Sequence, residues 1–231
     1  RRVGLEFLEE EKIMGQLNGS EILAKALKRE GVEELFFLMG GPMLTAEAAT
    51  IQEGIRCIDV RHEQAAAMMA QAYSRLRQKP GFCMAASGPA TINLSTGLAN
   101  ALIDCCPVVA LGGASPMLGN GKQVFQEIDQ MEIMSGCVKY AARIYDARRI
   151  PEMLNVAIQK AMSGKPGPVY LDLPGDTLYQ MVDEDAIDWS QSGRAILNAR
   201  PPAPEEQIAE LVAALAKAER PVLLTGSGII W

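Results

Sequence analysis

The sequence predicts an α/β fold, a doubly wound sheet of six parallel strands with helices on both faces. Between Gly19 and Tyr179, short apolar runs of strand length alternate with segments of helical periodicity. Most of these runs end in turns that contain glycine, and capping residues or prolines mark the ends of several helices. Such alternation is typical of parallel strands that are connected by helices.

Glycine and proline mark the elements of the first half. A helix begins at Asn18, where Glu21 three residues on completes a capping-box pattern, and it ends at Gly31. The elements predicted next are strand Leu35–Met39, which ends at Gly40-Gly41-Pro42; helix Leu44–Ile51; strand Arg56–Val60; helix Gln64–Arg75, which leads through Lys79-Pro80-Gly81; and strand Phe82–Ala86, which ends at Ser87-Gly88-Pro89.

The second half repeats the alternation. Pro151 begins its last long helix, since the first helical turn leaves its N–H groups without partners and tolerates proline. The predicted elements are helix Thr91–Ile103; strand Pro107–Leu111, closed by Gly112-Gly113; strand Val138–Ile144; helix Pro151–Met162, ended by Lys165-Pro166-Gly167-Pro168; and strand Val169–Leu173.

Composition shifts divide the chain. Residues 1–17 are expected to be a poorly ordered leader, with Met14 as the native start, and residues 18–179 form the predicted domain. Residues 180–203 are polar and lack periodicity, which predicts a linker. Residues 204–231 are expected to begin a second, truncated α/β domain, with helix Glu205–Ala218 and strand Pro221–Leu224. The chain is therefore expected to be the front part of a longer protein.

The overall charge and composition disfavour several partners. The net charge is −6 and the pI about 5.0, with no basic run, so we expect neither nucleic acid nor an anionic membrane as a partner. No signal peptide or membrane-length apolar stretch is evident, and a cytoplasmic location is expected. The five cysteines show no metal spacing. Cys105-Cys106 could form a strained vicinal disulfide, but buried thiols are favoured.

Glu63 stands where an extended segment meets a helix that is apolar on nearly every side. Arg61-His62-Glu63-Gln64 is followed by Ala65-Ala66-Ala67-Met68-Met69-Ala70. Such a helix is expected to be buried, which would leave the carboxylate partly desolvated and suited to proton transfer near neutral pH. The alternative is an ordinary first-turn acid facing the helix dipole. From Glu63 alone, this alternative is favoured.

Three glycine-containing turns follow predicted strands: Gly40-Gly41-Pro42, Ser87-Gly88-Pro89 and Gly112-Gly113. Ligands of doubly wound sheets bind outside the carboxyl ends of the strands, where these turns are expected to gather. Ordinary loop chemistry explains each turn taken alone. None contains a GxGxxG or Walker A sequence, so neither fingerprint predicts a nucleotide here.

Taken together, four segments resemble the thiamine diphosphate enzymes of the acetolactate synthase, oxalyl-CoA decarboxylase and 2-hydroxyacyl-CoA lyase group. The resemblance covers about Gly19 to Tyr179, the N-terminal pyrimidine-binding domain of that family, and residues 204–231 resemble the start of its central domain. The segments that carry it are Arg61-His62-Glu63-Gln64, Ala86-Ser87-Gly88-Pro89-Ala90-Thr91-Ile92-Asn93, Phe125-Gln126-Glu127-Ile128-Asp129-Gln130 and Gly164-Lys165-Pro166-Gly167-Pro168-Val169-Tyr170-Leu171-Asp172-Leu173-Pro174. One departure is Ala90, where relatives often carry glycine.

The resemblance implies a role for each matching residue. Glu63 would hydrogen-bond the aminopyrimidine ring nitrogen and activate the cofactor, which then serves as an electron sink. His62, beside it, would have a structural part rather than a catalytic one. Phe125 and Gln126 would lie near the substrate, although core packing is an equal alternative for Phe125. The implied cofactor-binding residues are Gly40, Gly41, Glu63, Pro89 and Asn93.

The resemblance also implies parts that these residues do not supply. The family holds the diphosphate through Mg²⁺ on a third domain, which is not found in this sequence, so no metal ligands are expected here. The cofactor would lie between two subunits of a homodimer or homotetramer. The 231 residues alone are therefore expected to be inactive.

Two branches of the family match. The segments around Asp129, Lys139 and Leu173 favour a 2-hydroxyacyl-CoA lyase or related carbon–carbon lyase, acting on a 2-hydroxyacyl-CoA or 2-keto acid. Phe125-Gln126-Glu127 and Gly97–Leu102 match acetolactate synthase equally well, which is the alternative. A second alternative, from a different functional class, is a non-catalytic domain that serves as an assembly module. The presence of Glu63 argues against it, because a scaffold needs no desolvated carboxylate.

Overall fold

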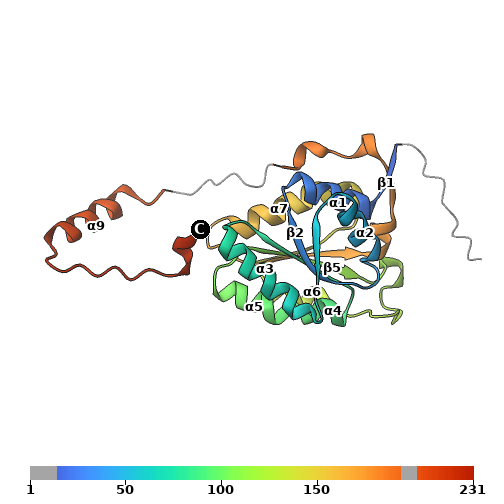
Figure 1. The fold of residues 1–231 in the computed structure, drawn as a ribbon, viewed down its shortest axis with the longest axis horizontal. Helices are drawn as coiled ribbons and strands as arrows, with labels where there is room; N and C mark the ends of the chain where they lie inside the picture. Colours follow the sequence, from blue (N-terminus) through green and yellow to red (C-terminus); the bar gives the residue numbers. More distant parts are fainter. Residues whose placement is uncertain (1–14, 194–201) are drawn as a thin grey trace, which may run out of the picture.

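The computed structural model describes residues 15–193 and 202–231. Its centre is a six-stranded sheet in the order β3-β2-β4-β5-β7-β6, in which every neighbouring pair is parallel (Figure 1). The predicted doubly wound, six-stranded parallel sheet is confirmed. The strands are β2 (Glu34–Leu38), β3 (Arg56–Asp59), β4 (Gly81–Ala85), β5 (Val108–Ala114), β6 (Tyr140–Arg143) and β7 (Val169–Pro174).

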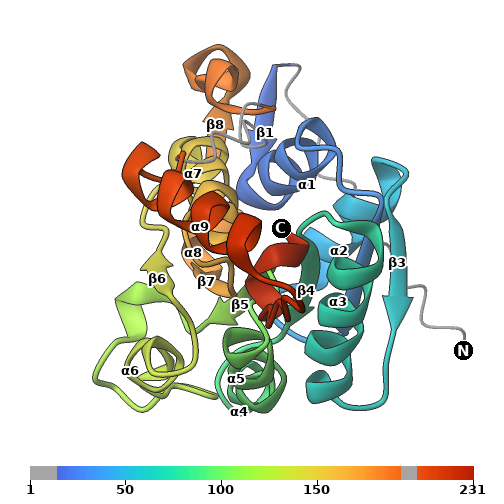
Figure 2. The same ribbon diagram turned by 90° about the vertical axis from the view of Figure 1, so that its left-hand side faces the viewer.

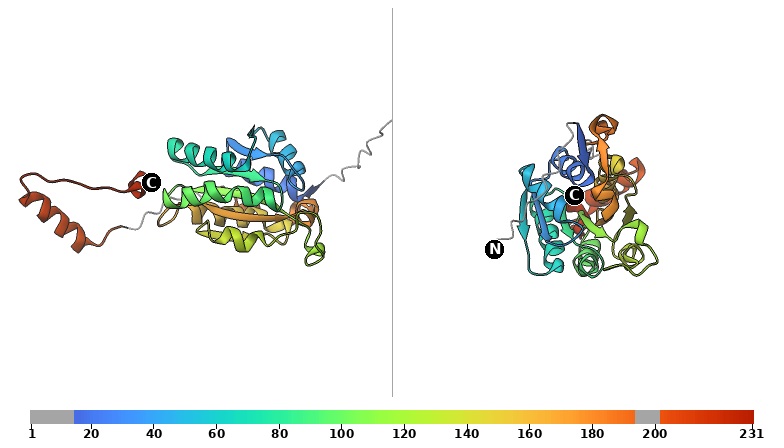
Figure 3. Two further views of the ribbon diagram at one scale, coloured as in Figure 1. Left: turned by 90° about the horizontal axis from the view of Figure 1, so that it is seen from below. Right: turned by 90° about the vertical axis from the view of Figure 1, so that its right-hand side faces the viewer.

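Helices cover both faces of the sheet and enclose two apolar cores. On one face, α1 (Gly19–Arg29) packs beside α2 (Leu44–Gln52) and α7 (Ile150–Met162), as Figure 2 shows for α1 and α2. On the other face, α3 (Glu63–Arg77) and α5 (Ser95–Ile103) lie side by side (Figure 3). The short helices α4 (Pro89–Asn93) and α6 (Gln130–Ser135) complete this second face.

The order of the strands places a switch point at β2. From β2 the chain crosses to β3 at one edge of the sheet, and from β3 it returns to β4 on the other side of β2. The two connections, α2 and α3, therefore lie on opposite faces of the sheet. The carboxyl ends of β2, β3 and β4 are neighbours, and this is where ligands bind in doubly wound folds.

The predicted start of α1 is confirmed. The Glu21 backbone N–H donates to Asn18 Oδ1 at 2.9 Å, and the Asn18 backbone N–H donates to Glu21 Oε2 at 3.0 Å. This reciprocal pair satisfies two of the N–H groups that a helix start leaves without intrahelical partners.

Two predicted boundaries in the middle of the domain are wrong. The Gly112-Gly113 pair lies inside β5 and is not a turn, and Gly112 is needed because an added Cβ would come within 2.6 Å of the Tyr170 ring on β7. The predicted helix Thr91–Ile103 is divided into α4 and α5. At the junction, the Leu94 N–H bonds to the Thr91 carbonyl, three residues back, which tightens the turn.

The segment after α8 (Gly175–Tyr179) folds back onto the domain. Strand β8 (Met181–Asp183) pairs antiparallel with β1 (Gln16–Asn18), and the side chains of Val182 and Ile187 are buried in the first core. Residues 181–191 therefore pack on the domain, although they fall within the expected linker. The expectation of a poorly ordered leader is wrong for Gln16 and Leu17, which belong to β1. Residues 1–14 of the expected leader and residues 194–201 of the expected linker lie outside the described residues.

The last described segment, residues 202–231, contains the expected helix as α9 (Glu205–Lys217), which extends away from the sheet (Figure 1). The strand expected at Pro221–Leu224 is not formed, and Val222 and Leu224 are almost fully exposed. A β-strand needs a neighbouring strand for its backbone hydrogen bonds, and none is placed beside this segment. Among the residues that the structure describes, no helix has the length and apolar character to cross a membrane.

Candidate functional site

Glu63 and Asn93 meet at the switch point of the sheet. Glu63 is the first residue of α3, directly after β3, and only 7% of its surface is exposed. Asn93 is the last residue of α4, and its Nδ2 donates to Glu63 Oε2 at 2.9 Å. No described residue forms a hydrogen bond with the other carboxylate oxygen, Oε1. One carboxylate oxygen is thus fixed by Asn93, and the other has no hydrogen-bond partner among the described residues.

His62 holds the start of α3 in place. Its backbone is extended, with φ −160° and ψ 136°, and its Nδ1 accepts a hydrogen bond from the Gln64 N–H at 3.2 Å. The side chain therefore caps the helix that carries Glu63, which agrees with the structural role expected for it. The helix itself is only partly buried, because Met68 and Met69 are exposed. The expectation of burial on every side is wrong for the single chain, but Glu63 is buried as expected.

The turn after β2 packs against the turn after β4. A Cβ added at Gly40 would lie 2.6 Å from the Ala86 Cβ, whereas nothing lies within 4 Å of the Cβ position at Gly41. The Ser87 N–H donates to the Gly41 carbonyl at 3.4 Å, and Ser87 Oγ lies 3.3 Å from the same oxygen. The absence of side chains at Gly40 and Gly41 lets the two turns approach and leaves open space beside them.

In the turn after β4, Gly88 has a backbone conformation that favours glycine. Its φ of +59° and ψ of −117° form a conformation that is strained for residues with a Cβ. An added Cβ would also lie closer than 3.0 Å to the Gln126 carbonyl oxygen. Pro89 follows as the first residue of α4 and is exposed at the surface of the turn.

The segment before α6 brings Gln126 to this turn. Gln126 Oε1 accepts a hydrogen bond from Ser87 Oγ at 2.7 Å. Its neighbour Phe125 is 86% exposed, so the alternative that Phe125 packs in the core is wrong. The structure thus gathers Gln126 with Ser87 and Gly88, while Phe125 contacts no core.

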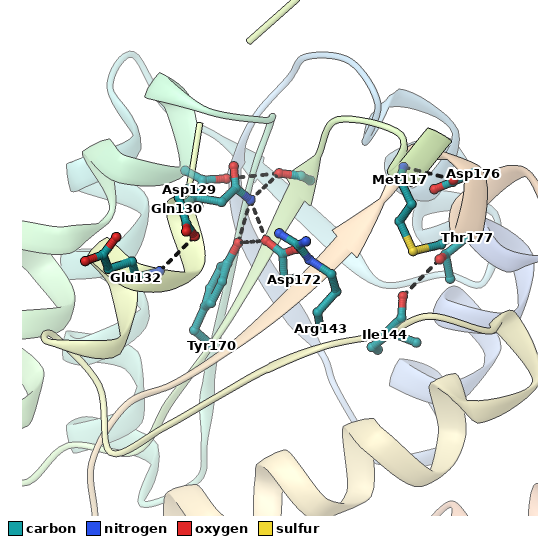
Figure 4. A network of polar contacts seen from close by, with 12 residues as sticks. Met117, Asp129, Gln130, Glu132, Arg143, Ile144, Tyr170, Asp172, Asp176 and Thr177 are labelled. Carbon is teal, nitrogen blue, oxygen red and sulfur yellow. Dashed lines mark hydrogen bonds and ion pairs between the residues drawn. The ribbon is translucent and has the colours of Figure 1, made fainter. Parts of the chain in front are cut away.

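Gln130 was not singled out from the sequence, but it is the most connected side chain near the site (Figure 4). Its Oε1 accepts from the Gly88 N–H at 2.8 Å. Its Nε2 lies 2.8 Å from the Gly113 carbonyl, 2.7 Å from Tyr170 Oη and 2.6 Å from Asp172 Oδ1. The sequence signal was Asp172 itself, an acidic residue in the apolar run Val169–Pro174.

Asp172 is fully buried, and its charge is balanced within the network. Arg143 Nε on β6 donates to Asp172 Oδ2. Burial raises the pKa of the Tyr170 hydroxyl well above its usual value, and the carboxylate of Asp172 raises it further. The hydroxyl therefore stays protonated and donates to Asp172 Oδ1. A buried ion pair with this many hydrogen bonds keeps a fixed geometry.

The fold and these side chains define a class of protein. They describe an α/β domain with a buried carboxylate and glycine-containing turns at the carboxyl ends of neighbouring strands, the place where doubly wound folds bind small ligands. Within the described part of the chain, no group of three or more His, Cys, Asp or Glu side chains is arranged to hold a metal ion.

Comparison with known families agrees with this class. The family model described as "Thiamine pyrophosphate enzyme, N-terminal TPP binding domain" matches residues 17–133, just over half of the chain. The chain therefore belongs to the thiamine pyrophosphate enzyme family, and it carries that family's N-terminal cofactor-binding domain.

The relatives include both branches that the sequence suggested. Acetolactate synthase from the chloroplast of Arabidopsis thaliana is 36% identical over 216 residues, covering 92% of this chain and 32% of the relative. The large subunit of acetolactate synthase isozyme 2 of Escherichia coli is 36% identical over 215 residues, 92% of this chain and 38% of the relative. The 2-hydroxyacyl-CoA lyase of Arabidopsis thaliana is 33% identical over 219 residues, covering 92% of this chain and 38% of the relative. The chain thus spans about a third of the length of these relatives.

Proposed function

We propose that the protein is a thiamine diphosphate-dependent enzyme that makes or breaks carbon–carbon bonds, and that Glu63 activates the cofactor. The observation that carries the proposal is the buried Glu63 carboxylate, with Oε2 held by Asn93 at 2.9 Å and Oε1 without a partner among the described residues. A carboxyl group held in this way can share a proton with a ring nitrogen that approaches Oε1.

The surrounding residues fit the pyrimidine half of the cofactor. Gly41 leaves open space, and Pro89 offers an exposed apolar surface to the ring. Bound thiamine diphosphate supplies a carbon nucleophile and an electron sink. Gln126 Nε2 makes no hydrogen bond with the described residues, so it can donate to a substrate oxygen.

The proposed site is completed by another subunit. We assign the diphosphate and its Mg²⁺ to a domain outside these residues, facing Glu63 across an interface in at least a homodimer. Exposed apolar side chains on α3 and α5 support such an interface: Met68, Met69, Leu76 and Ile103. Sedimentation of the full-length protein tests this assembly, and an active monomer would contradict it.

For the reaction, we propose a 2-hydroxyacyl-CoA lyase or related carbon–carbon lyase, with acetolactate synthesis as the alternative. Both reactions begin with the same activation by Glu63, and both branches are found among the relatives. Assaying the full-length protein with a 2-hydroxyacyl-CoA and with a 2-keto acid distinguishes them. Turnover of the keto acid alone would favour the synthase.

The test of the proposed function is the substitution Glu63→Gln in the full-length protein. Glutamine keeps the shape of the side chain and an oxygen that accepts from Asn93, but it cannot take up the proton. We expect exchange of the thiazolium C2 proton for deuterium and turnover both to fall by roughly 10²–10⁴-fold or more. Binding of thiamine diphosphate with Mg²⁺ should persist.

His62→Asn is the matched control, since asparagine is also a good helix cap and His62 has no assigned proton-transfer role. We expect it to change C2 exchange much less than Glu63→Gln. Near-normal exchange in Glu63→Gln would remove Glu63 from the mechanism. A wild-type protein that fails to bind the cofactor would instead favour the assembly module.

A further inference from the structure

Gln130 links the turn after β4 to the centre of the sheet. Its side chain is 1% exposed, and it spans from the Gly88 backbone N–H to groups on β5 and β7 (Figure 4). Because the Gln130 side chain is buried, it cannot contact a ligand directly. We therefore expect any effect on a ligand to pass through Gly88.

The buried carboxylate of Asp172 decides which way the Gln130 amide points. A primary amide has one acceptor oxygen and one NH₂ group with two hydrogens. A charged carboxylate only accepts hydrogen bonds, so Nε2 must face Asp172 Oδ1, at 2.6 Å. Oε1 is then left facing the Gly88 N–H, at 2.8 Å. The reversed amide would place two oxygens together in a buried site.

Two more side chains of the network bind the Asp172 carboxylate directly. Arg143 pairs with Oδ2, and the Tyr170 hydroxyl donates to Oδ1. Tyr170 also lies 2.7 Å from Gln130 Nε2, where its oxygen can accept. Three strands thus contribute to the orientation of one amide, since Arg143 lies on β6, Tyr170 and Asp172 on β7, and the accepting Gly113 carbonyl on β5.

The turn at Gly88 is held from two sides. Gln130 fixes its N–H from the interior, while Ser87 binds the Gln126 side chain and the Gly41 carbonyl on the outer side. Pro89 is the next residue. A shift of the Gly88 peptide would therefore move the surface that the pyrimidine is proposed to contact.

We infer that Gln130, oriented by the buried Asp172–Arg143 pair and Tyr170, is a positioning residue that sets the Ser87–Pro89 turn for cofactor binding. It acts through the Gly88 N–H and does not touch the cofactor. The inference rests on the proposed function for the identity of the ligand. The link between Gln130 and Gly88 can be tested without any ligand.

The test compares Gln130→Met with Gln71→Met in the full-length protein. Methionine is similar in length to glutamine but cannot form the amide hydrogen bonds. Gln71 is also buried, and its amide also bridges two polar side chains, Asn100 and Asp104, but it lies on α3 away from Gly88. Both variants lose a buried amide, so both are expected to lower the melting temperature.

Two measurements separate positioning from general stability. Without ligand, amide hydrogen exchange of the peptide containing Gly88 should be about tenfold faster in Gln130→Met, since that N–H loses its acceptor, and unchanged in Gln71→Met. With thiamine diphosphate and Mg²⁺ as the probe, the dissociation constant should rise about tenfold in Gln130→Met and change less than twofold in Gln71→Met.

Unchanged exchange at Gly88 in a folded Gln130→Met protein would overturn the inference. So would equal losses of cofactor affinity in the two variants. If Gln130→Met does not fold, Tyr170→Phe replaces it, because it removes one partner of both Gln130 and Asp172. Tyr170→Phe should accelerate exchange at Gly88 by about two- to threefold. An unchanged rate would overturn the inference. Failure of the wild-type protein to bind thiamine diphosphate would refute the proposed function, while the exchange result at Gly88 would still stand.

Discussion

Replacing Gly88 by alanine tests the geometry of the turn after β4. The φ of +59° and ψ of −117° cost a residue with a Cβ about 1–3 kcal/mol in backbone strain. The new Cβ also meets the Gln126 carbonyl oxygen, a backbone atom that cannot rotate away, and overpacking of this kind costs about 1–3 kcal/mol. The lower entropy of the unfolded chain offsets about 0.4–1 kcal/mol. The net loss is therefore about 1–6 kcal/mol.

Thermal unfolding measures this loss. For a domain of this size, about 3 kcal/mol corresponds to a decrease in melting temperature of roughly 6–12 °C. Gly121→Ala is the control, since Gly121 has a φ of +77° but nothing within 4 Å of its Cβ position. The stability of this variant should fall only by the cost of a left-handed backbone for alanine, about 1–2 kcal/mol before the same entropic offset. Equal melting temperatures for the two variants would refute the argument from the contact with Gln126.

Three further outcomes are expected. Gly97→Ala should lower the melting temperature by roughly 2–12 °C, since its Cβ would lie 2.5 Å from an alanine methyl group on α3 and overpacking costs about 1–3 kcal/mol. The hydrogen bond from Arg75 lowers the pKa of Asp104 below 3.8, so the stability contributed by this ionised carboxylate is present at neutral pH and lost as the pH falls through the folded pKa. Melting curves of Asp104→Asn and the parent chain should therefore differ most near neutral pH and converge below pH 3.8; a constant difference would contradict this. Burial raises the pKa of the Cys83 thiol to about 12, so iodoacetamide at pH 8 should modify the partly exposed Cys137 first, and peptide mapping that finds Cys83 modified first would contradict its burial.

The centre of the sheet could be predicted because its strands β4, β5 and β7 are buried on both faces. Five consecutive buried residues in β4 and seven in β5 appear in the sequence as uninterrupted runs of small and apolar residues. The end of β5 could not be predicted, because Gly112-Gly113 has the composition of a turn. Only the position of Tyr170 on the neighbouring strand shows that Gly112 leaves room for an aromatic ring. Contacts between residues distant in sequence carry information that a local pattern lacks.

The site could also be predicted only in part. Glu63 follows a strand and opens a helix, so its place at the edge of the sheet could be predicted locally. The family resemblance gave Asn93 as a cofactor-binding residue, but its hydrogen bond to Glu63 was not predicted. The position of Gln130 depends on how three strands align in register, with Asp172 opposite both Gly112 and Arg143. The sequence contains the buried acid but does not indicate which side chains neutralise it.

The pairing of β1 with β8 brings the two ends of the domain together. Gln16 lies opposite Asp183, so the chain enters and leaves the folded unit at adjacent points. The connectivity between α7 and β7, by contrast, passes through an exposed turn at Gly164, with nothing within 4 Å of its Cβ position. A circularly permuted chain, joined across the β1–β8 ends and opened at Gly164, would keep every strand of the sheet and the Glu63–Asn93 pair intact.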